Sequence, residues 1–291
     1  MRDGKVGWNP GKLNPNAMTA TGPTDPQVQA IFFEPLHKPD MHAPAVAVYA
    51  NFSMHPDTVS GTKISADYPG VLSRLIAGYH GPECITVYGN GTCGNLNHLD
   101  TSWQRRQGGI EETNRIGTLL AAAIFRAEKS QRTFAPGIVR VKSVTVPLSV
   151  PSVSPEQAEM ARETIRKGTN GAAPAFMELV RANRLLDLAA RDGKPVPAEV
   201  QVISLGPDVA WVGLPGEVFV ELGLALKKRS PFRHTIIATL TNGNWGYIPD
   251  RRSYAEGAYE AESSRVEPGS GEKLVDAAAE LLAELHGEAS K

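Results

Sequence analysis

The chain lacks a charge excess of either sign. Its 291 residues include 30 lysines and arginines against 31 aspartates and glutamates, and the formal net charge is -1. Proteins that bind nucleic acid or anionic membrane surfaces usually carry a basic excess, so the composition points away from both. Two cysteines, Cys84 and Cys93, are too few for a disulfide framework and lack metal-type spacing.

Long apolar runs are also missing. No segment reaches the roughly 18 apolar residues of a membrane span. Residues 1–16 are polar and rich in Gly, Pro and Asn, without the apolar core of a signal peptide. This opening resembles a surface loop more than the first element of a domain, and we therefore expect the chain to begin partway through a longer protein.

The overall composition is typical of a globular protein. Hydrophobic residues make up 41% of the chain and charged residues 21%, as in domains with a substantial core. A chain of this length can hold one domain or two. Alternating or β-branched apolar runs predict strands over residues 28–33, 45–52, 85–88, 138–146, 200–205, 209–214 and 234–240.

Apolar residues at helical spacing predict helices over residues 68–79, 111–129, 155–167, 174–191, 218–228 and about 272–285. The pair between 155 and 191 has polar faces, which indicates a helical insertion at about 152–195 on the outside of the fold. We therefore expect a single domain, 1–291, of the α/β class, with a mixed β-sheet core and flanking helices.

The stretch after the strand at 45–52 carries the first reactive side chain, His55. Histidine is neutral near pH 7 and can offer a ring nitrogen to a metal or to a proton. Asp57, Ser65 and Asp67 are close in sequence and could orient it, although a structural histidine in a turn is the alternative. Asp67 also occupies an N-cap position, and capping explains it as well as a catalytic role does.

Residues 89–100, GNGTCGNLNHLD, combine three glycines and three asparagines directly after a strand. Glycine lets the backbone approach a ligand closely. The segment lacks the GxxxxGK[ST] pattern of a phosphate loop. Cys93 and His98 could form a thiol nucleophile and its base, but nothing nearby in sequence lowers the pKa of the thiol, so we disfavour this interpretation.

Three loops each follow a predicted strand and bring His55, Glu217 and Tyr247 to the ends of the strands. Nitrogen and oxygen ligands of these types can bind zinc and leave one position open for water. Such a metal lowers the pKa of bound water and polarises a carbonyl, as amide or ester hydrolysis requires. Alternatively, Glu217 sits in the first turn of its helix, where the dipole favours it, and Tyr247 is an ordinary aromatic residue.

Four segments resemble motifs of one known family. ISADYPG (64–70) is similar to ISGDNKG, TCGNLNH (92–98) to NAGNLSP, and LPGEVF (214–219) to PGEFT. The most specific is NGNWGYIPDRRSYAEGAYEAESS (242–264), which is similar to NxYxxYxxTxEEYxxQxYEGAST in several residue types and offsets. The chain thus resembles the neutral (non-lysosomal) ceramidases, zinc amidases that hydrolyse N-acyl-sphingosine, and specifically the C-terminal portion of their catalytic domain.

The resemblance implies His55, Glu217 and Tyr247 as zinc ligands. It implies Tyr259 as a hydroxyl near the reacting carbonyl, suited to stabilising an oxyanion. It matches Asp67 to a supporting aspartate. The family takes another zinc ligand from an HTHSGP-type segment, which this chain lacks: its only earlier histidines, at positions 37 and 42, stand in a different context.

A second departure concerns the glycine and asparagine loop. The serine of the family's GNLSP is Asn97 here, and asparagine cannot act as an acyl-accepting nucleophile. Asn97, or a backbone amide in the segment that starts at Gly94, could instead donate a hydrogen bond to the substrate. His98 is a candidate general acid or base, with a structural role as the favoured alternative.

The resemblance implies a zinc-dependent hydrolase that cleaves an amide bond by metal-activated water, with Zn²⁺ as its cofactor. Its partner would be a small-molecule or lipid amide, which a membrane surface could present, and family members are secreted or cell-envelope proteins. An ester or a glycan amide is a further substrate alternative. The other class of function is a non-catalytic or truncated homologue that acts as a binding or structural protein.

Overall fold

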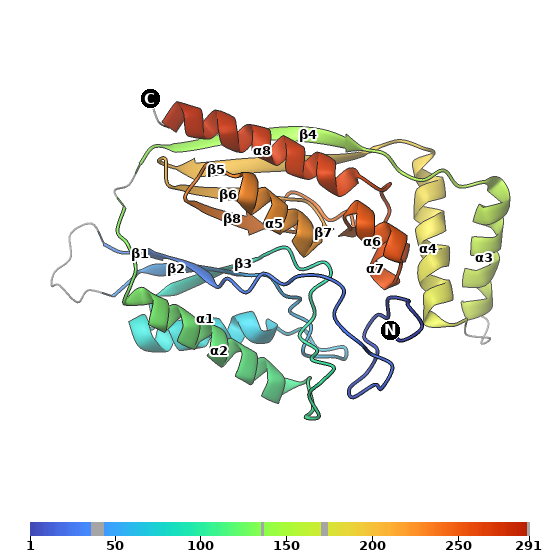
Figure 1. Ribbon diagram of the computed structural model, residues 1–291, viewed down its shortest axis with the longest axis horizontal. Coiled ribbons are helices and arrows are strands. Elements are labelled where there is room, and N and C mark those ends of the chain that lie inside the picture. The colour runs from blue at the N-terminus through green and yellow to red at the C-terminus, as the bar shows by residue number, and fades with distance from the viewer. Residues whose placement is uncertain (36–43, 135–136, 170–173, 290–291) are drawn as a thin grey trace.

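The computed structural model describes residues 1–35, 44–134, 137–169 and 174–289, which form two mixed β-sheets flanked by helices (Figure 1). In the first sheet, β2 (Ala47–Phe52) lies between antiparallel β1 (Gln29–Phe33) and parallel β3 (Ile85–Asn90). This architecture confirms the predicted α/β class with a mixed sheet core.

The second sheet has the order β4-β5-β6-β8. Its strands are β4 (Val139–Leu148), β5 (Val196–Leu205), β6 (Val209–Gly213) and β8 (His234–Ala238). The pairs β4–β5 and β5–β6 are antiparallel, and β8 is parallel to β6. β5 begins four residues before the predicted start at 200, because its pairing with β4 continues through Val196.

Two helices, α1 (Asp67–His80) and α2 (Ile110–Glu128), pack on the first sheet (Figure 1). Val48 and Ala50 alternate with the more exposed residues of β2, so both face these helices. The buried helix residues that meet them recur at helical spacing and include Leu72, Ile76, Leu120 and Ile124.

The second sheet is covered by α5 (Val220–Arg229) and α8 (Ser270–Ala289) (Figure 1). Every second residue of β5 from Val196 to Val202 is buried in this second core. Leu274, Ala278 and Leu282 of α8 fill it from the other side. Among the described helices, none combines the length and apolar character that crossing a membrane requires.

The two sheets meet where β8 contacts β2 and β3. The buried amide of Asn51 donates from Nδ2 to the carbonyl oxygen of Gly89 at 2.8 Å and to that of Ile237 at 3.0 Å. The backbone nitrogen of Thr239 donates to the carbonyl of Asn90 at 2.9 Å. Because β2 is parallel to β3 and β6 to β8, the carboxyl ends of all four strands gather in one region.

Two helices predicted from the sequence, α3 (Pro155–Thr169) and α4 (Phe176–Arg191), form a hairpin beside the sheets (Figure 1). That this pair is an insertion within a single domain stays a prediction. Four short elements follow that the sequence analysis did not predict. They are β7 (Glu217–Val218), β9 (Tyr247–Ile248), α6 (Arg251–Glu256) and α7 (Tyr259–Ser263).

Candidate active site

His55, Glu217 and Tyr247 meet at the gathered strand ends. β7 and β9 pair in parallel with Glu217 directly opposite Tyr247, so both side chains lie on the same face of this small ladder. The Glu217 carboxylate and the Tyr247 hydroxyl are close enough for each to shift the pKa of the other. His55 follows β2, and its Nε2 lies 3.7 Å from Oε2 of Glu217. The His55 and Tyr247 rings stand nearly perpendicular, with centroids 6.2 Å apart.

The backbone of the glycine and asparagine loop holds these residues in place. The amide of His55 donates to the carbonyl of Leu96, and the amide of Gly94 donates to that of Val218, each at 3.0 Å. A Cβ atom at Gly94 would lie only 2.3 Å from the carbonyl oxygen of Glu217. Gly94 therefore supports the site through the close approach of two backbones, which only glycine permits.

Burial shapes the electrostatics of the cluster. It raises the pKa of the Glu217 carboxyl, and the charge of His55 opposes this shift. Burial and the neighbouring Glu217 carboxylate raise the pKa of the Tyr247 hydroxyl. The side chains of His55 and Glu217 remain 19% and 21% exposed, so a small ligand can still reach them.

This donor set fits zinc. Imidazole nitrogen, carboxylate oxygen and phenol oxygen are all hard or borderline donors, and catalytic zinc sites use three protein ligands plus an open position. The poorly solvated Glu217 carboxylate is a group that a bound cation would stabilise. Within the described ranges no three His, Cys, Asp or Glu side chains cluster in a metal-binding arrangement, and the third donor of this set is the phenol of Tyr247.

Two cavities flank the cluster. The smaller, of about 360 Å³, is lined among others by Trp8, His55, Asn97 and Tyr259. The larger, of about 860 Å³, lies against α4. Both are bounded by Glu217, Tyr247 and Tyr259, which form the wall that they share, whereas His55 lines only the smaller cavity.

Tyr259 lies beside Tyr247, and its role near a reacting carbonyl stays a prediction. Its ring meets that of Tyr247 edge-on at 5.7 Å and stacks on Trp8 at 4.6 Å. Its neighbour Glu260 also lines the smaller cavity, and burial raises the pKa of that carboxyl. The sequence analysis missed Glu260, although its place in the segment 242–264 is a usable signal. Trp8 carries no such signal, because it belongs to an irregular loop.

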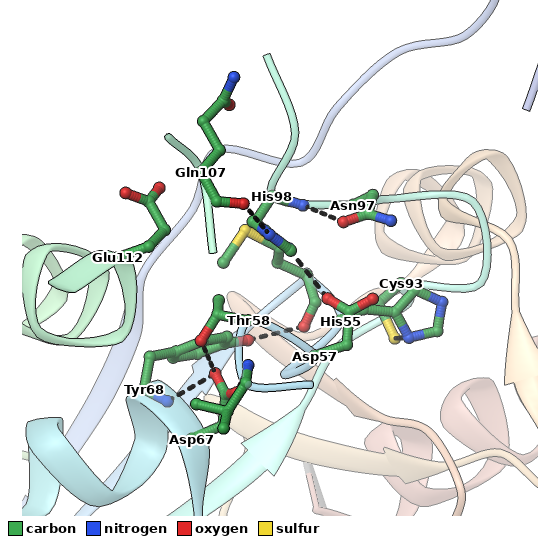
Figure 2. A network of polar contacts seen from close by, with 12 residues as sticks. His55, Asp57, Thr58, Asp67, Tyr68, Cys93, Asn97, His98, Gln107 and Glu112 are labelled. Atoms are coloured by element: carbon green, nitrogen blue, oxygen red, sulfur yellow. Dashed lines mark hydrogen bonds and ion pairs between the residues drawn. The ribbon is translucent and has the colours of Figure 1, made fainter. Parts of the chain in front are cut away.

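Asp67 supports the loop that carries His55. Its buried carboxylate accepts from the Thr58 hydroxyl at 2.8 Å, the Val59 amide at 3.0 Å and the Tyr68 amide at 2.7 Å (Figure 2). The N-cap interpretation is wrong, because α1 begins at Asp67 itself and the cap is Ala66, without a side-chain bond. Asp67 is instead bound to the preceding loop and does not line either cavity.

His98 is engaged on both ring nitrogens. Nδ1 lies 2.9 Å from Oδ1 of Asp57, and Nε2 lies 3.1 Å from the carbonyl oxygen of Gln107 (Figure 2). The Asp57 carboxylate raises the pKa of the ring. His98 lines neither cavity, whereas Asn97 faces the smaller one. The contacts therefore support the structural role for His98, and the general acid or base role stays a prediction.

Cys93 lies behind His55 instead of pairing with His98. Its Sγ is 3.8 Å from Nδ1 of His55 and accepts from Nδ2 of Asn90 at 2.9 Å. Burial raises the pKa of the thiol to about 12, so it stays protonated. This excludes the thiolate nucleophile at neutral pH. The two earlier histidines, at positions 37 and 42, lie outside the described residues.

Comparison with known proteins supports the fold. The chain is similar to the crystal structure of neutral ceramidase from Pseudomonas aeruginosa, with a TM-score of 0.65 and 18% identity over 90% of this chain and 47% of that one. It is also similar to a structure of a ceramidase complexed with C2, with a TM-score of 0.63 and 17% identity over 90% and 48%.

The chain thus spans about half the length of these solved structures and shares the fold of that part. No family model matches the sequence. No curated protein matches it either. At the level of the fold, the ceramidase resemblance seen in the four sequence segments is confirmed.

Proposed function

We propose that this chain carries the metal site and part of the substrate cavity of a ceramidase-like, zinc-dependent hydrolase that cleaves an amide bond. One observation carries the proposal: His55, Glu217 and Tyr247, from three separate segments, converge beside two cavities that share Glu217 and Tyr247 as a wall. The likeness of the fold to neutral ceramidase supports it. In this site zinc would supply Lewis acidity, polarising a carbonyl and lowering the pKa of a bound water.

The protein groups have separable tasks. His55 and Glu217 would hold the metal together with Tyr247, and the backbone of Gly94 keeps the Glu217 strand in place. Tyr259 reaches both cavities and would donate its hydroxyl proton in a hydrogen bond to the substrate carbonyl oxygen as negative charge develops there. Asn97 faces the smaller cavity, and its Nδ2 could donate in the same way.

The reaction would proceed without an acyl-enzyme. Asn97 replaces the serine that a covalent mechanism would require, and the Cys93 thiol is protonated at neutral pH. Direct attack of water on the amide carbonyl is then the remaining mechanism. Because both ring nitrogens of His98 are engaged, it could pass a proton to the leaving amine only after breaking one of those bonds.

The proposal extends to substrate and location. An amide with an acyl chain, either a small molecule or a lipid such as ceramide, suits cavities whose walls include Phe176, Leu179 and Trp8. A secreted or cell-envelope location, with a lipid substrate taken from a membrane surface, rests on the family resemblance alone.

The first test is the zinc content of the purified protein. We expect about one zinc per chain in the wild type, and its loss in His55→Ala and in Glu217→Gln. Glu217→Gln keeps the size of the side chain but removes its charge. The matched control is Glu284→Gln, which changes an exposed carboxylate of α8 that pairs with Lys142 and should keep its zinc.

The alternative is a non-catalytic or truncated homologue that binds a ligand or partner. A well-folded wild type without zinc, unaffected by chelators, would support this alternative and contradict our proposal. If zinc is present, hydrolysis of a panel of N-acyl amides with and without chelator decides between an enzyme and a metal-dependent binding protein.

A further inference from the structure

The larger cavity has a wall that the proposed reaction does not use. It lies between α4 and the segment from Asn244 to Arg265, and it opens directly onto Glu217, Tyr247 and Tyr259. α4 contacts α7 along this side. At about 860 Å³ the cavity is large enough for a small amphipathic molecule whose amide reaches the shared wall.

The charges around this cavity are mostly positive. Arg184, Arg191 and Arg265 line it, against the two carboxylates of Asp187 and Glu217. Arg265 forms an ion pair with Asp187, with its Nη2 at 2.6 Å from Oδ2 of that residue. The guanidinium of Arg191 lies over the ring of Trp245, 5.0 Å from its centroid.

Arg184 has no acidic partner among the described residues. Its Nε donates to the carbonyl oxygen of Ser264, and among the described residues neither terminal nitrogen has an acceptor within hydrogen-bond distance. The side chain lines the cavity. Burial lowers the pKa of this guanidinium, and the nearby charge of Arg265 acts in the same direction. A partly desolvated guanidinium of this kind gains most from an anion that accepts two parallel hydrogen bonds.

A buried indole lies beside these guanidinium groups. Nε1 of Trp245 has no hydrogen-bond partner among the described residues, and the Trp245 side chain lines the larger cavity. Phe176, Leu179 and Val180 of α4 add apolar surface to the same wall. The wall therefore combines apolar side chains with the guanidinium groups of Arg184 and Arg191.

We propose that the amide substrate carries an anionic group, a carboxylate or a phosphate, which Arg184 binds within the larger cavity while the amide lies against Glu217 and Tyr259. Arg191 contributes to the same anion site. This inference rests on the proposed function for the role of the bound molecule. The anion site itself is independent of zinc, because none of its donors is a proposed metal ligand.

The test measures binding by calorimetry to three amides with the same short acyl chain: N-octanoylglycine, N-octanoylethanolamine phosphate and the neutral N-octanoylethanolamine. The protein is treated with chelator, so that no carboxylate or phosphate can bind a metal instead. We expect at least one anionic amide to bind about tenfold or more tightly than the neutral one, as a charge-assisted bidentate pair would give. The carboxylate and phosphate arms identify which anion is preferred.

Arg184→Gln should reduce this preference to about twofold or less, and Arg184→Lys should retain part of it. The matched control is Arg181→Gln on the same helix, whose side chain pairs with Glu262 and does not line the cavity, and it should leave the preference unchanged. Because Arg184 also holds the Ser264 carbonyl, Arg191→Gln serves as a second variant with less structural risk, and it should weaken the preference.

Equal binding of anionic and neutral amides to the wild type would overturn the inference. So would an undiminished preference in a folded Arg184→Gln and Arg191→Gln double variant. Neither outcome bears on the zinc content of the untreated protein, so failure of the anion site and failure of the proposed hydrolase are distinguishable.

Discussion

His98 forms hydrogen bonds through both ring nitrogens, to the Asp57 carboxylate and to the Gln107 carbonyl. Both partners are acceptors, so both bonds require the doubly protonated ring, and the Asp57 carboxylate raises the pKa of His98 in favour of that form. The side chain is only 6% exposed. Asp67 behaves similarly, since its carboxylate binds the 58–59 backbone and hydroxyl instead of facing a cavity. Polar residues next to a candidate site can thus stabilise the conformation of a loop without contacting a substrate.

The pH dependence of stability tests the His98 contact. Asp57 raises the folded-state pKa of His98 above its ordinary value of 6.5. The stabilisation is therefore complete below the unfolded-state pKa and is lost as the pH rises through the folded-state pKa. We expect the free energy of unfolding to fall by about 1 kcal/mol across this window, measured by urea denaturation at a series of pH values.

His98→Gln should flatten this part of the pH profile, and Asp57→Asn should do the same, because each removes one member of the charged pair. His234→Gln is the control, since His234 is exposed. A wild type whose stability rises over this window, or a His98→Gln variant with an unchanged slope, would show that His98 is not held as a cation.

At the scale of elements, the site depends on the shortest ones. β7 and β9 are each two residues long, yet their pairing places Glu217 beside Tyr247. The loop at Gly94 packs on β7 through the bond from its amide to the Val218 carbonyl. Such short strands have little stability of their own, so the neighbouring loop must maintain their geometry.

Gly94→Ala should damage this element without touching a proposed ligand. The added Cβ would lie 2.3 Å from the Glu217 carbonyl oxygen, which forces the loop and the strand apart. We expect a loss of about 2 kcal/mol in the free energy of unfolding, together with a reduced zinc content. Gly108→Ala is the control, because its Cβ would meet nothing closer than the Thr58 carbonyl at 3.6 Å. Full zinc content in a folded Gly94→Ala protein would contradict the packing argument.

At the scale of the whole molecule, the junction of the two sheets decides where the site forms. Asn51 is 2% exposed and bridges the carbonyls of Gly89 and Ile237, which belong to different sheets. Thr239 joins β8 to the end of β3 in the same region. This junction aligns the strand ends from which His55, Glu217 and Tyr247 follow.

Asn51→Ala should weaken the whole fold. It leaves the Ile237 carbonyl without the Asn51 donor, and an unsatisfied buried acceptor costs about 2 kcal/mol. Urea denaturation should show a lower midpoint with a single cooperative transition. Gln131→Ala, which removes an exposed amide that contacts Glu34, should change stability by less than about 0.5 kcal/mol. Equal stability of the two variants would mean that the Asn51 bridge does not hold the sheets together.

The sequence by itself determined the class of fold and the long elements. Periodicity is a local property, so the alternation in β2 and the helical spacing in α2 and α8 were readable without knowing their partners. The order of strands and loops also predicted that His55, Glu217 and Tyr247 would gather at one edge, and the four ceramidase-like segments pointed to the same residues.

Only the tertiary structure decided the rest. β7 and β9 are too short for a periodic signal and form by pairing between residues distant in sequence. Whether His98 faced the substrate or a carboxylate depended on the position of Asp57 in another loop. Arg184 belongs to a helix whose polar faces the sequence shows, and only the fold places it in a cavity wall together with Arg265. Contacts of this kind join distant parts of the chain, and no local pattern records them.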